Sequence, residues 1–210
     1  MKDVGGARAA GGIGAVRDAR PAEYPALGRC LARAFETDPV MRWLFPDAAI
    51  RARRMPRFYR LVAVELGRAG AVHTVDGLLG AAIWRGPHAP ARGRLSRVWA
   101  MLRFAAVLGG ASRRSGEFFA RLERWHPEEP HWYLGVLGTD PPRQGRGVGS
   151  QLLRPVLARC DAEGRLAWLE SSKRENLPFY ERHGFQVVDE VRLAGAPPVW
   201  PMRREAGPLA

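Results

Sequence analysis

Residues 131–150 read HWYLGVLGTDPPRQGRGVGS, and this stretch decides the fold. Its first nine residues are largely apolar and predict a β-strand over 131–139. A Pro-Pro pair follows the strand, and an apolar pattern of helical period covers 148–163. Between the strand and the helix lie glycines at 145, 147 and 149. This order of strand, glycine-rich loop and helix is typical of sites that hold phosphate groups at a helix N-terminus.

The alternating glycines let the loop backbone turn its N–H groups toward one side, because no Cβ stands in the way. The unpaired N–H groups and the dipole of the following helix complete an anion cradle that suits a pyrophosphate. The loop is not a P-loop, since no Lys-Ser/Thr pair follows the last glycine, and its spacing is not GxGxxG. A plain strand-to-helix turn is the alternative explanation of the glycines.

The same pattern analysis extends in both directions along the chain. The loop is followed by a predicted strand over 166–170, a short helix over 176–183, and closing strands over 185–193 and 199–204. Upstream we expect a strand over 13–19, helices over 21–35, 49–68, 95–106 and 118–125, and a hairpin of 71–75 with 78–84 around Asp76-Gly77. Strands that alternate with helices predict an α/β or α+β fold with a central mixed sheet.

Composition and charge exclude several classes of protein. A chain of 210 residues with 46% hydrophobic and 26% charged residues can bury a sizeable core and is not disordered. The formal net charge of +12 is spread along the chain, so a nucleic acid is not an expected partner. Between Gly77 and Gly116 the sequence carries seven arginines and no acidic residue. A solvated basic face, help with an anionic ligand, and nucleic-acid binding all remain open for that segment.

Cysteine and histidine usage gives little support for metal chemistry. Cys30 and Cys160 lie on helical apolar stripes and are expected to be buried packing thiols. The five histidines lack the HExxH spacing and other paired-ligand patterns, so no metal is expected. The sequence shows no apolar run of membrane-spanning length, and its first twenty residues lack the apolar core of a signal peptide. A cytoplasmic location without membrane attachment is therefore the expectation.

Two motifs carry a resemblance to a known family. The segment QGRGVG at 144–149 resembles the Q/R-x-x-G-x-G signature of the GNAT acetyltransferases, which bind the pyrophosphate of acetyl-coenzyme A. The segment NLPFYERHGF at 176–185 resembles the late motif of the same family. Residues 127–204 also resemble the puromycin N-acetyltransferases within it, whereas the N-terminal half is similar only in layout.

The resemblance implies a GNAT fold, in which a central twisted mixed sheet of about six or seven strands has splayed middle strands and flanking helices. It implies one N-acetyltransferase domain over 13–204, with a disordered tail over 1–12 and a second tail over 205–210. Residues 13–130 would form the acceptor-side half, including a helical insertion at about 86–128. Residues 131–204 would form the half that binds acetyl-coenzyme A and performs catalysis.

The resemblance also implies roles for individual residues. Tyr180 is expected to protonate the departing thiolate, with a core tyrosine as the alternative. Glu170 is expected to act as base or amine anchor, although it could instead pair with an arginine. His131 and Trp132 are weighed as lining of the acceptor pocket against packing roles. The implied contacts of acetyl-coenzyme A are Leu137, Gly138, Thr139, Gln144, Gly145, Arg146, Gly147, Val148, Gly149, Ser150 and Asn176.

The function expected from this resemblance is acetyl-coenzyme A-dependent N-acetylation of a small-molecule amine, with no metal cofactor. An aminonucleoside antibiotic such as puromycin is one candidate acceptor, which would make the protein an antibiotic-resistance enzyme. The alternatives are a non-catalytic acyl-coenzyme A sensor and an acetyltransferase of protein or peptide amines. A monomer and a homodimer are both compatible with the sequence.

Overall fold

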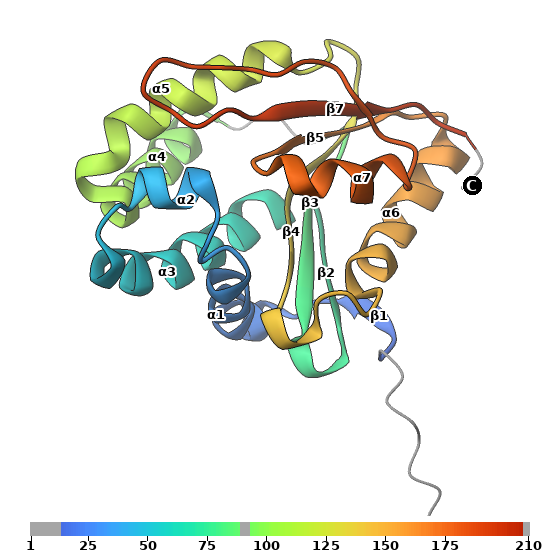
Figure 1. Cartoon of the computed structure of the whole chain (residues 1–210), viewed down its shortest axis with the longest axis horizontal. Coiled ribbons are helices and arrows are strands. Elements are labelled where there is room, and N and C mark those ends of the chain that lie inside the picture. Colours follow the sequence, from blue (N-terminus) through green and yellow to red (C-terminus); the bar gives the residue numbers. More distant parts are fainter. Residues whose placement is uncertain (1–13, 89–92, 208–210) are drawn as a thin grey trace, which may run out of the picture.

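The computed structural model describes residues 14–88 and 93–207 (Figure 1). The predicted tail over 1–12 and the last three residues of the predicted tail over 205–210 lie outside the described residues. The described strands are β1 (Val16–Asp18), β2 (Gly70–Val75), β3 (Gly80–Arg85), β4 (Trp132–Thr139), β5 (Ala167–Ser171), β6 (Gln186–Val187) and β7 (Trp200–Arg204). The described α-helices are α1 (Tyr24–Ala34), α2 (Pro39–Leu44), α3 (Ala48–Gly67), α4 (Arg94–Leu108), α5 (Ser112–Leu122), α6 (Val148–Glu163) and α7 (Leu177–Glu181).

The strands form a single mixed sheet of seven strands with the order β1-β2-β3-β4-β5-β7-β6. β4 and β5 run parallel and are connected through α6, while all other neighbouring strands in the sheet are antiparallel. A parallel pair needs a crossover connection of this kind. The prediction of an α/β fold with a mixed sheet of six or seven strands flanked by helices is confirmed.

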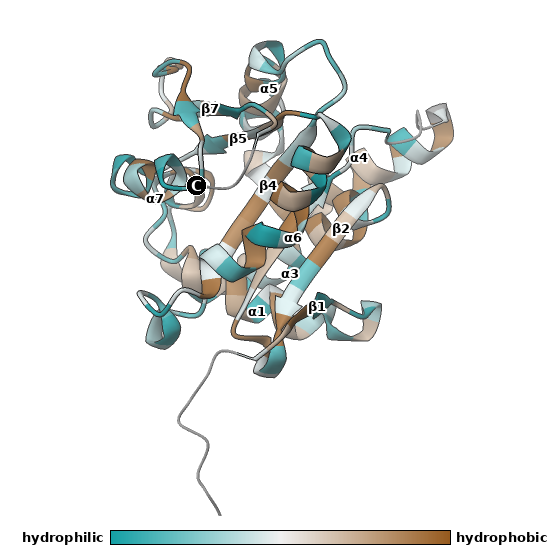
Figure 2. Cartoon of the chain, turned by 90° about the vertical axis from the view of Figure 1, so that its right-hand side faces the viewer, coloured by the Kyte–Doolittle hydropathy of each residue, from teal (hydrophilic) through white to brown (hydrophobic). Residues whose placement is uncertain are grey.

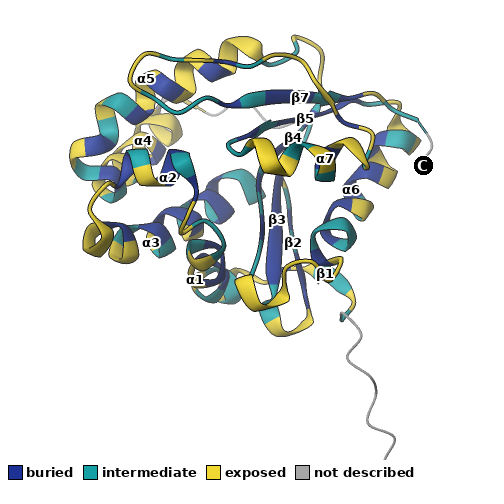
Figure 3. Cartoon of the chain, in the orientation of Figure 1, coloured by how far each residue is buried: buried dark blue, intermediate teal, exposed yellow. Residues whose placement is uncertain are grey.

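Helices cover both faces of this sheet. α1 and α3 pack together on one face, and α6 packs on the other face against β2, β3 and β4 (Figure 1). The apolar stripes that predicted these helices are buried, as Leu31 of α1, Met55 of α3 and Leu157 of α6 show. Figure 2 shows hydrophobic residues along β2 and β4, and Figure 3 shows β3 buried between the two helical layers. Each face of the sheet thus has its own core, the α1/α3-side core and the α6-side core.

The middle strands separate soon after they begin. Register pairs between β4 and β5 extend only from Trp132–Ala167 to Leu134–Leu169, although β4 continues to Thr139. The register between β3 and β4 shifts at Ile83/Trp84, which makes Gly135 the extra residue of a bulge. A Cβ on Gly135 would lie 2.4 Å from Leu66 Cδ2, so the Leu66 side chain of α3 packs directly over this glycine. The expected splay of the two central strands is confirmed.

The bulge also changes which way the side chains of β4 point. Leu134 lies in the α6-side core, whereas Val136 lies in the α1/α3-side core. After Leu134 the edge of β4 that faces β5 has no register partner in β5. The backbone groups of this edge therefore remain available to a ligand.

Two local predictions differ from the structure. The hairpin does not turn on Asp76-Gly77 alone, because β3 starts at Gly80 and Leu78 has a φ of 54°. The Thr74 hydroxyl donates to the Gly80 carbonyl at 2.8 Å and holds this wider turn closed. The closing strand over 185–193 is reduced to β6 and an isolated bridge between Val191 and Val199.

A short helix, α2, was not expected at the Asp38-Pro39 pair. Proline suits the first position of a helix, and the Asp38 carboxylate accepts a hydrogen bond from the Met41 N–H at 2.9 Å. α1 itself already ends at Ala34, so the dipeptide marks the start of α2. The predicted insertion is present as α4 and α5, the latter extended by a 3-10 turn over Glu123–Trp125. In the described part of the chain, no helix is long and apolar enough to cross a membrane.

Candidate functional site

A cleft of about 390 Å³ opens where β4 and β5 separate. Its size is within the range of small-molecule sites. It brings together Tyr180 and every predicted cofactor contact except Arg146, which is exposed outside it. The lining residues are Ala34, Phe35, Asp38, Leu137, Gly138, Thr139, Arg143, Gln144, Gly145, Gly147, Val148, Gly149, Ser150, Lys173, Asn176, Phe179, Tyr180 and Arg182.

The glycine-rich loop forms one wall of the cleft. Gly145 and Gly147 have φ values of 72° and 85°, a conformation that side chains with a Cβ rarely adopt. Gly147 is the residue immediately before α6, and its carbonyl accepts from the Gln151 N–H at 3.0 Å. The earlier N–H groups of the first turn have no acceptor within the helix. Because these residues line the cleft, the helix N-terminus offers its donors and its dipole to a bound anion.

Cationic side chains surround this wall. Arg143, Lys173 and Arg182 all line the cleft, and the ammonium group of Lys173 donates to the Thr37 hydroxyl at 2.8 Å. The acidic residue among the lining, Asp38, is 3% exposed and uses its oxygens to cap α2 and to accept from the Ser172 hydroxyl. The cleft therefore combines a positive rim with an internally satisfied carboxylate.

Two of the predicted cofactor contacts stabilise the scaffold itself. The Gln144 side-chain amide donates to the Thr139 carbonyl at 3.1 Å and joins the loop to the end of β4. The Ser150 hydroxyl lies 2.9 Å from His183 Nε2 and joins α6 to the turn after α7. These contacts fix the distance between the loop and the opposite wall of the cleft.

Tyr180 lies on that opposite wall, in α7. Its ring packs edge-on against Phe179 and Phe185, with centroid distances of 5.2 and 6.0 Å. Its hydroxyl has no hydrogen-bond partner among the residues that the structure describes. Burial, with a smaller contribution from the charge of Asp38, raises the pKa of Tyr180 above its ordinary value. The site thus contains a neutral hydroxyl that is free to donate to a ligand.

Glu170 lies one residue beyond the last register pair of β5 with β4, on the opposite face from Leu169. Its Oε2 accepts from the Tyr133 hydroxyl at 3.0 Å, and its Oε1 accepts from Trp168 Nε1 at 2.7 Å. His126 Nε2 is 2.8 Å from the same Oε1. Sequence analysis considered an arginine as the partner of Glu170, and the structure supplies a histidine instead.

Sequence analysis missed both Asp38 and His126. Asp38 received no functional prediction, although an Asp before Pro signals a helix start. His126 belongs to the end of the insertion, and its contact with β5 depends on tertiary structure that no local spacing indicates. Its only signal is the density of aromatic residues and histidines over 125–133.

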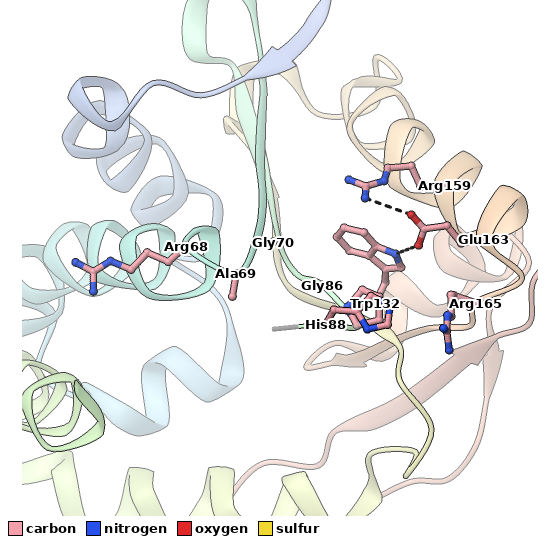
Figure 4. Close-up of a pocket in the computed structure, with 10 residues that line it drawn as sticks. Arg68, Ala69, Gly70, Gly86, His88, Trp132, Arg159, Glu163 and Arg165 are labelled. Carbon is pink, nitrogen blue, oxygen red and sulfur yellow. Dashed lines mark hydrogen bonds and ion pairs between the residues drawn. The ribbon is translucent and has the colours of Figure 1, made fainter. Parts of the chain in front are cut away.

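A second hollow, of about 620 Å³, lies near the start of β2 and the end of β3, and includes Trp132 of β4 (Figure 4). Trp132 donates from Nε1 to Glu163 at 3.1 Å, and Arg159 lies 4.6 Å from its ring centroid. Sequence analysis weighed Trp132 as lining of the acceptor pocket. The structure places it in this hollow, away from the glycine-rich loop. This hollow lacks the glycine-rich loop and Tyr180, so we assign the site to the smaller cleft. Glu170 lines neither of the two cavities.

The cysteines and histidines form no metal centre in the described residues, where no group of three potential ligands occurs. Cys30 and Cys160 are buried and free, as expected of packing thiols. Burial raises the pKa of Cys30 to about 11 and that of Cys160 to about 12.

Comparisons with known proteins agree with this geometry. Residues 104–187 match the family model described as the acetyltransferase (GNAT) domain. An uncharacterized N-acetyltransferase of Schizosaccharomyces pombe is 27% identical over 187 residues, which cover 81% of this chain and 74% of that protein. The uncharacterized N-acetyltransferase YafP of Escherichia coli is 31% identical over 98 residues, which cover 47% of this chain and 51% of YafP.

A crystal structure described as histone acetyltransferase HPA2 and related acetyltransferase, from Corynebacterium glutamicum, superposes with a TM-score of 0.71 at 24% identity. The match covers 95% of this chain and 100% of that one. At this level of identity the similarity concerns the fold, including the arrangement of elements around the cleft.

Proposed function

We propose that this chain is an acetyltransferase of the GNAT superfamily and that it transfers the acetyl group of acetyl-coenzyme A to the amine of a small molecule. The observation that carries the proposal is the cleft itself. It places an anion-binding helix N-terminus, an unpaired strand edge and the free hydroxyl of Tyr180 around one space. These are the groups that a nucleotide thioester and its reacting carbonyl require.

Acetyl-coenzyme A would lie along the cleft with its pyrophosphate on the loop from Gln144 to Ser150. The donors there are backbone N–H groups, with Arg143 and Arg182 as nearby cations. The pantetheine arm would pair with the free edge of β4 at residues 137–139, while Asn176 would reach it from the other wall. Arg146 would contribute only long-range charge, since it does not line the cleft.

The chemistry needs a neutral amine, an oxyanion donor and a proton for the leaving thiolate. The amine nitrogen attacks the thioester carbonyl, and a backbone N–H near Leu137 or Thr139 stabilises the oxyanion. The carbon–sulfur bond then breaks, and the thiolate takes the Tyr180 proton. The proton that the amine loses goes to Oε2 of Glu170. This oxygen has one partner in the protein, whereas Oε1 has two.

The acceptor class rests on the resemblance of residues 127–204 to the puromycin N-acetyltransferases. An aminonucleoside antibiotic is accordingly the first acceptor to test, and a resistance role would follow from it. On this proposal residues 13–204 act as one catalytic domain, in which the half before residue 131 shapes the acceptor side.

A thiol-release assay with acetyl-coenzyme A and a panel of amines tests the proposal. The panel should contain puromycin, simple amines, aminoglycosides and amine-bearing peptides, each paired with an analogue in which a hydroxyl replaces the amine. We expect turnover with at least one small-molecule amine and none with its hydroxyl analogue. Turnover of peptides alone would indicate a protein or peptide acetyltransferase. Tight acetyl-coenzyme A binding without any turnover would instead indicate a sensor module.

A further inference from the structure

His126 connects the insertion to the catalytic half of the molecule. It follows the 3-10 turn over Glu123–Trp125 and precedes β4, and its side chain is only 7% exposed. Its ring lies 4.7 Å from the Tyr133 ring and 5.8 Å from the Trp168 ring, between the two aromatic residues that also donate to Glu170. The carboxylate and the imidazole are therefore enclosed by the same aromatic walls.

Two carboxylates, one guanidinium and a second imidazole surround the ring nitrogens of His126. Nε2 is 2.8 Å from Glu170 Oε1 and 4.0 Å from Glu123 Oε2. Nδ1 is 3.5 Å from an Arg85 guanidinium nitrogen and 3.3 Å from His131 Nε2. The arginine can only donate to Nδ1, whereas the imidazole of His131 can accept from it.

His131 is fixed by its own backbone contact. Its Nδ1 is 2.8 Å from the Glu129 carbonyl, which can only accept, so Nδ1 carries a proton. Burial lowers the pKa of His131, which favours the neutral ring with an unprotonated Nε2. That nitrogen is then an acceptor for His126 Nδ1–H.

Both ring nitrogens of His126 therefore have partners: Nε2 lies within hydrogen-bonding distance of Glu170, and Nδ1 faces Arg85 and His131. No polar atom of this buried ring is left without a partner, so its orientation toward Glu170 is held from both sides.

We propose that His126 is the positioning residue of Glu170: its Nε2–H fixes the carboxylate at the splay. Oε1 is occupied by Trp168 and His126, so Oε2 is left to receive the proton of the amine. This inference rests on the proposed role of Glu170. It gives the insertion a function in the reaction, because the residue that orients the base comes from its C-terminal end.

The first test uses kinetics. His126→Leu removes the donor toward Glu170, His126→Gln keeps one, and His88→Gln is the matched control because His88 is exposed. We expect kcat of His126→Leu to fall by about tenfold to a hundredfold and that of His126→Gln to recover most of the loss, with the KM for acetyl-coenzyme A within about twofold of wild type in both. A wild-type kcat in His126→Leu, or no recovery in His126→Gln, would overturn the inference.

Glu170→Gln separates this inference from the proposed function. If Glu170→Gln is as active as wild type, the base itself is wrongly assigned. If Glu170→Gln is inactive and His126→Leu is normal, only the positioning role fails.

A second test needs neither activity nor a stable His126 variant. In ¹⁵N-histidine spectra recorded at one fixed pH, the His126 Nε2 signal should shift between wild type and Glu170→Gln, because that variant removes the carboxylate oxygen 2.8 Å from Nε2. An unchanged His126 Nε2 signal would overturn the inference.

Discussion

Tyr180 and Phe179 are neighbours in sequence that share the cleft, yet only Tyr180 has an atom that can give up a proton. Replacing Tyr180 by Phe deletes the hydroxyl and preserves the edge-on ring contacts. We expect kcat to fall by about ten- to a thousandfold, since general acids typically contribute on this scale. The KM for acetyl-coenzyme A should hardly change, the pattern of an interaction made mainly in the transition state.

Steady-state kinetics of the folded Tyr180→Phe protein, with Phe179→Leu as a packing control, distinguishes the roles. A wild-type kcat would make Tyr180 a packing residue. A raised KM at constant kcat would mean that the hydroxyl anchors the cofactor sulfur.

Gly147 is the position at which the cradle depends most on the absence of a side chain. Valine at its φ of 85° would cost roughly 1–2 kcal/mol of backbone strain and would place methyl groups where the anion binds. We expect Gly147→Val to bind acetyl-coenzyme A at least about tenfold more weakly by calorimetry. Gly116→Ala is the control, because an added Cβ there meets no atom within 4 Å. Equal affinities of Gly147→Val and wild type would refute the assignment of the loop.

At the scale of elements, a bidentate ion pair joins α6 to β7. Arg204 donates to both oxygens of Asp161, at 2.8 and 2.9 Å, and the same carboxylate accepts from the Gly207 N–H. The hydrogen bonds from Arg204 hold the pKa of Asp161 below its usual range. Because the folded-state pKa is depressed, this stabilisation is present above the unfolded pKa of about 3.9 and is lost as pH falls through the folded value.

Asp161→Asn should therefore lower Tm at pH 7 by roughly 3–8 °C, since Arg204 is left 4% exposed without a counter-charge. The difference in Tm between variant and wild type should shrink toward zero below about pH 3. Glu205→Gln is the control, since Glu205 is a far more exposed carboxylate on the neighbouring Arg203. A Tm difference that stays constant from pH 7 to acid would contradict this account.

The elements that the sequence predicted well are those with a local signal. α6 begins and ends where its apolar period and flanking glycines indicated, and β4 starts within one residue of its predicted position. The turn before β3 was wrong because a side-chain bond from Thr74 holds it. β6 was overestimated because only Gln186 and Val187 pair with β7, and Val187 and Val188 are exposed although they are apolar. The Glu170–His126 contact joins distant segments, so no local pattern could reveal it.

On the scale of the whole molecule, the cleft is the place where segments from both halves of the chain meet. Phe35 and Asp38 come from the N-terminal half, and Tyr180 from the C-terminal end. A ligand bound there adds its binding free energy to the stability of the entire fold. At about 100 times its dissociation constant, acetyl-coenzyme A should contribute about 2.7 kcal/mol, which corresponds to a rise in Tm of roughly 5–10 °C.

Thermal unfolding with and without acetyl-coenzyme A measures this shift, and Gly147→Val should lose most of it. Desulfo-coenzyme A should reproduce much of the rise if the pyrophosphate provides most of the affinity. A wild-type Tm that is indifferent to saturating acetyl-coenzyme A would contradict the proposed cofactor site.

The buried cysteines have a consequence for a protein that handles an activated thioester. With thiol pKa values of about 11 and about 12, only about one Cys30 in 10⁴ and one Cys160 in 10⁵ is ionised at pH 7. The enzyme is thereby protected from acylating itself, because the nucleophile in thioester exchange is the thiolate. Disulfide reagents that count free coenzyme A should accordingly record the product and leave the protein silent.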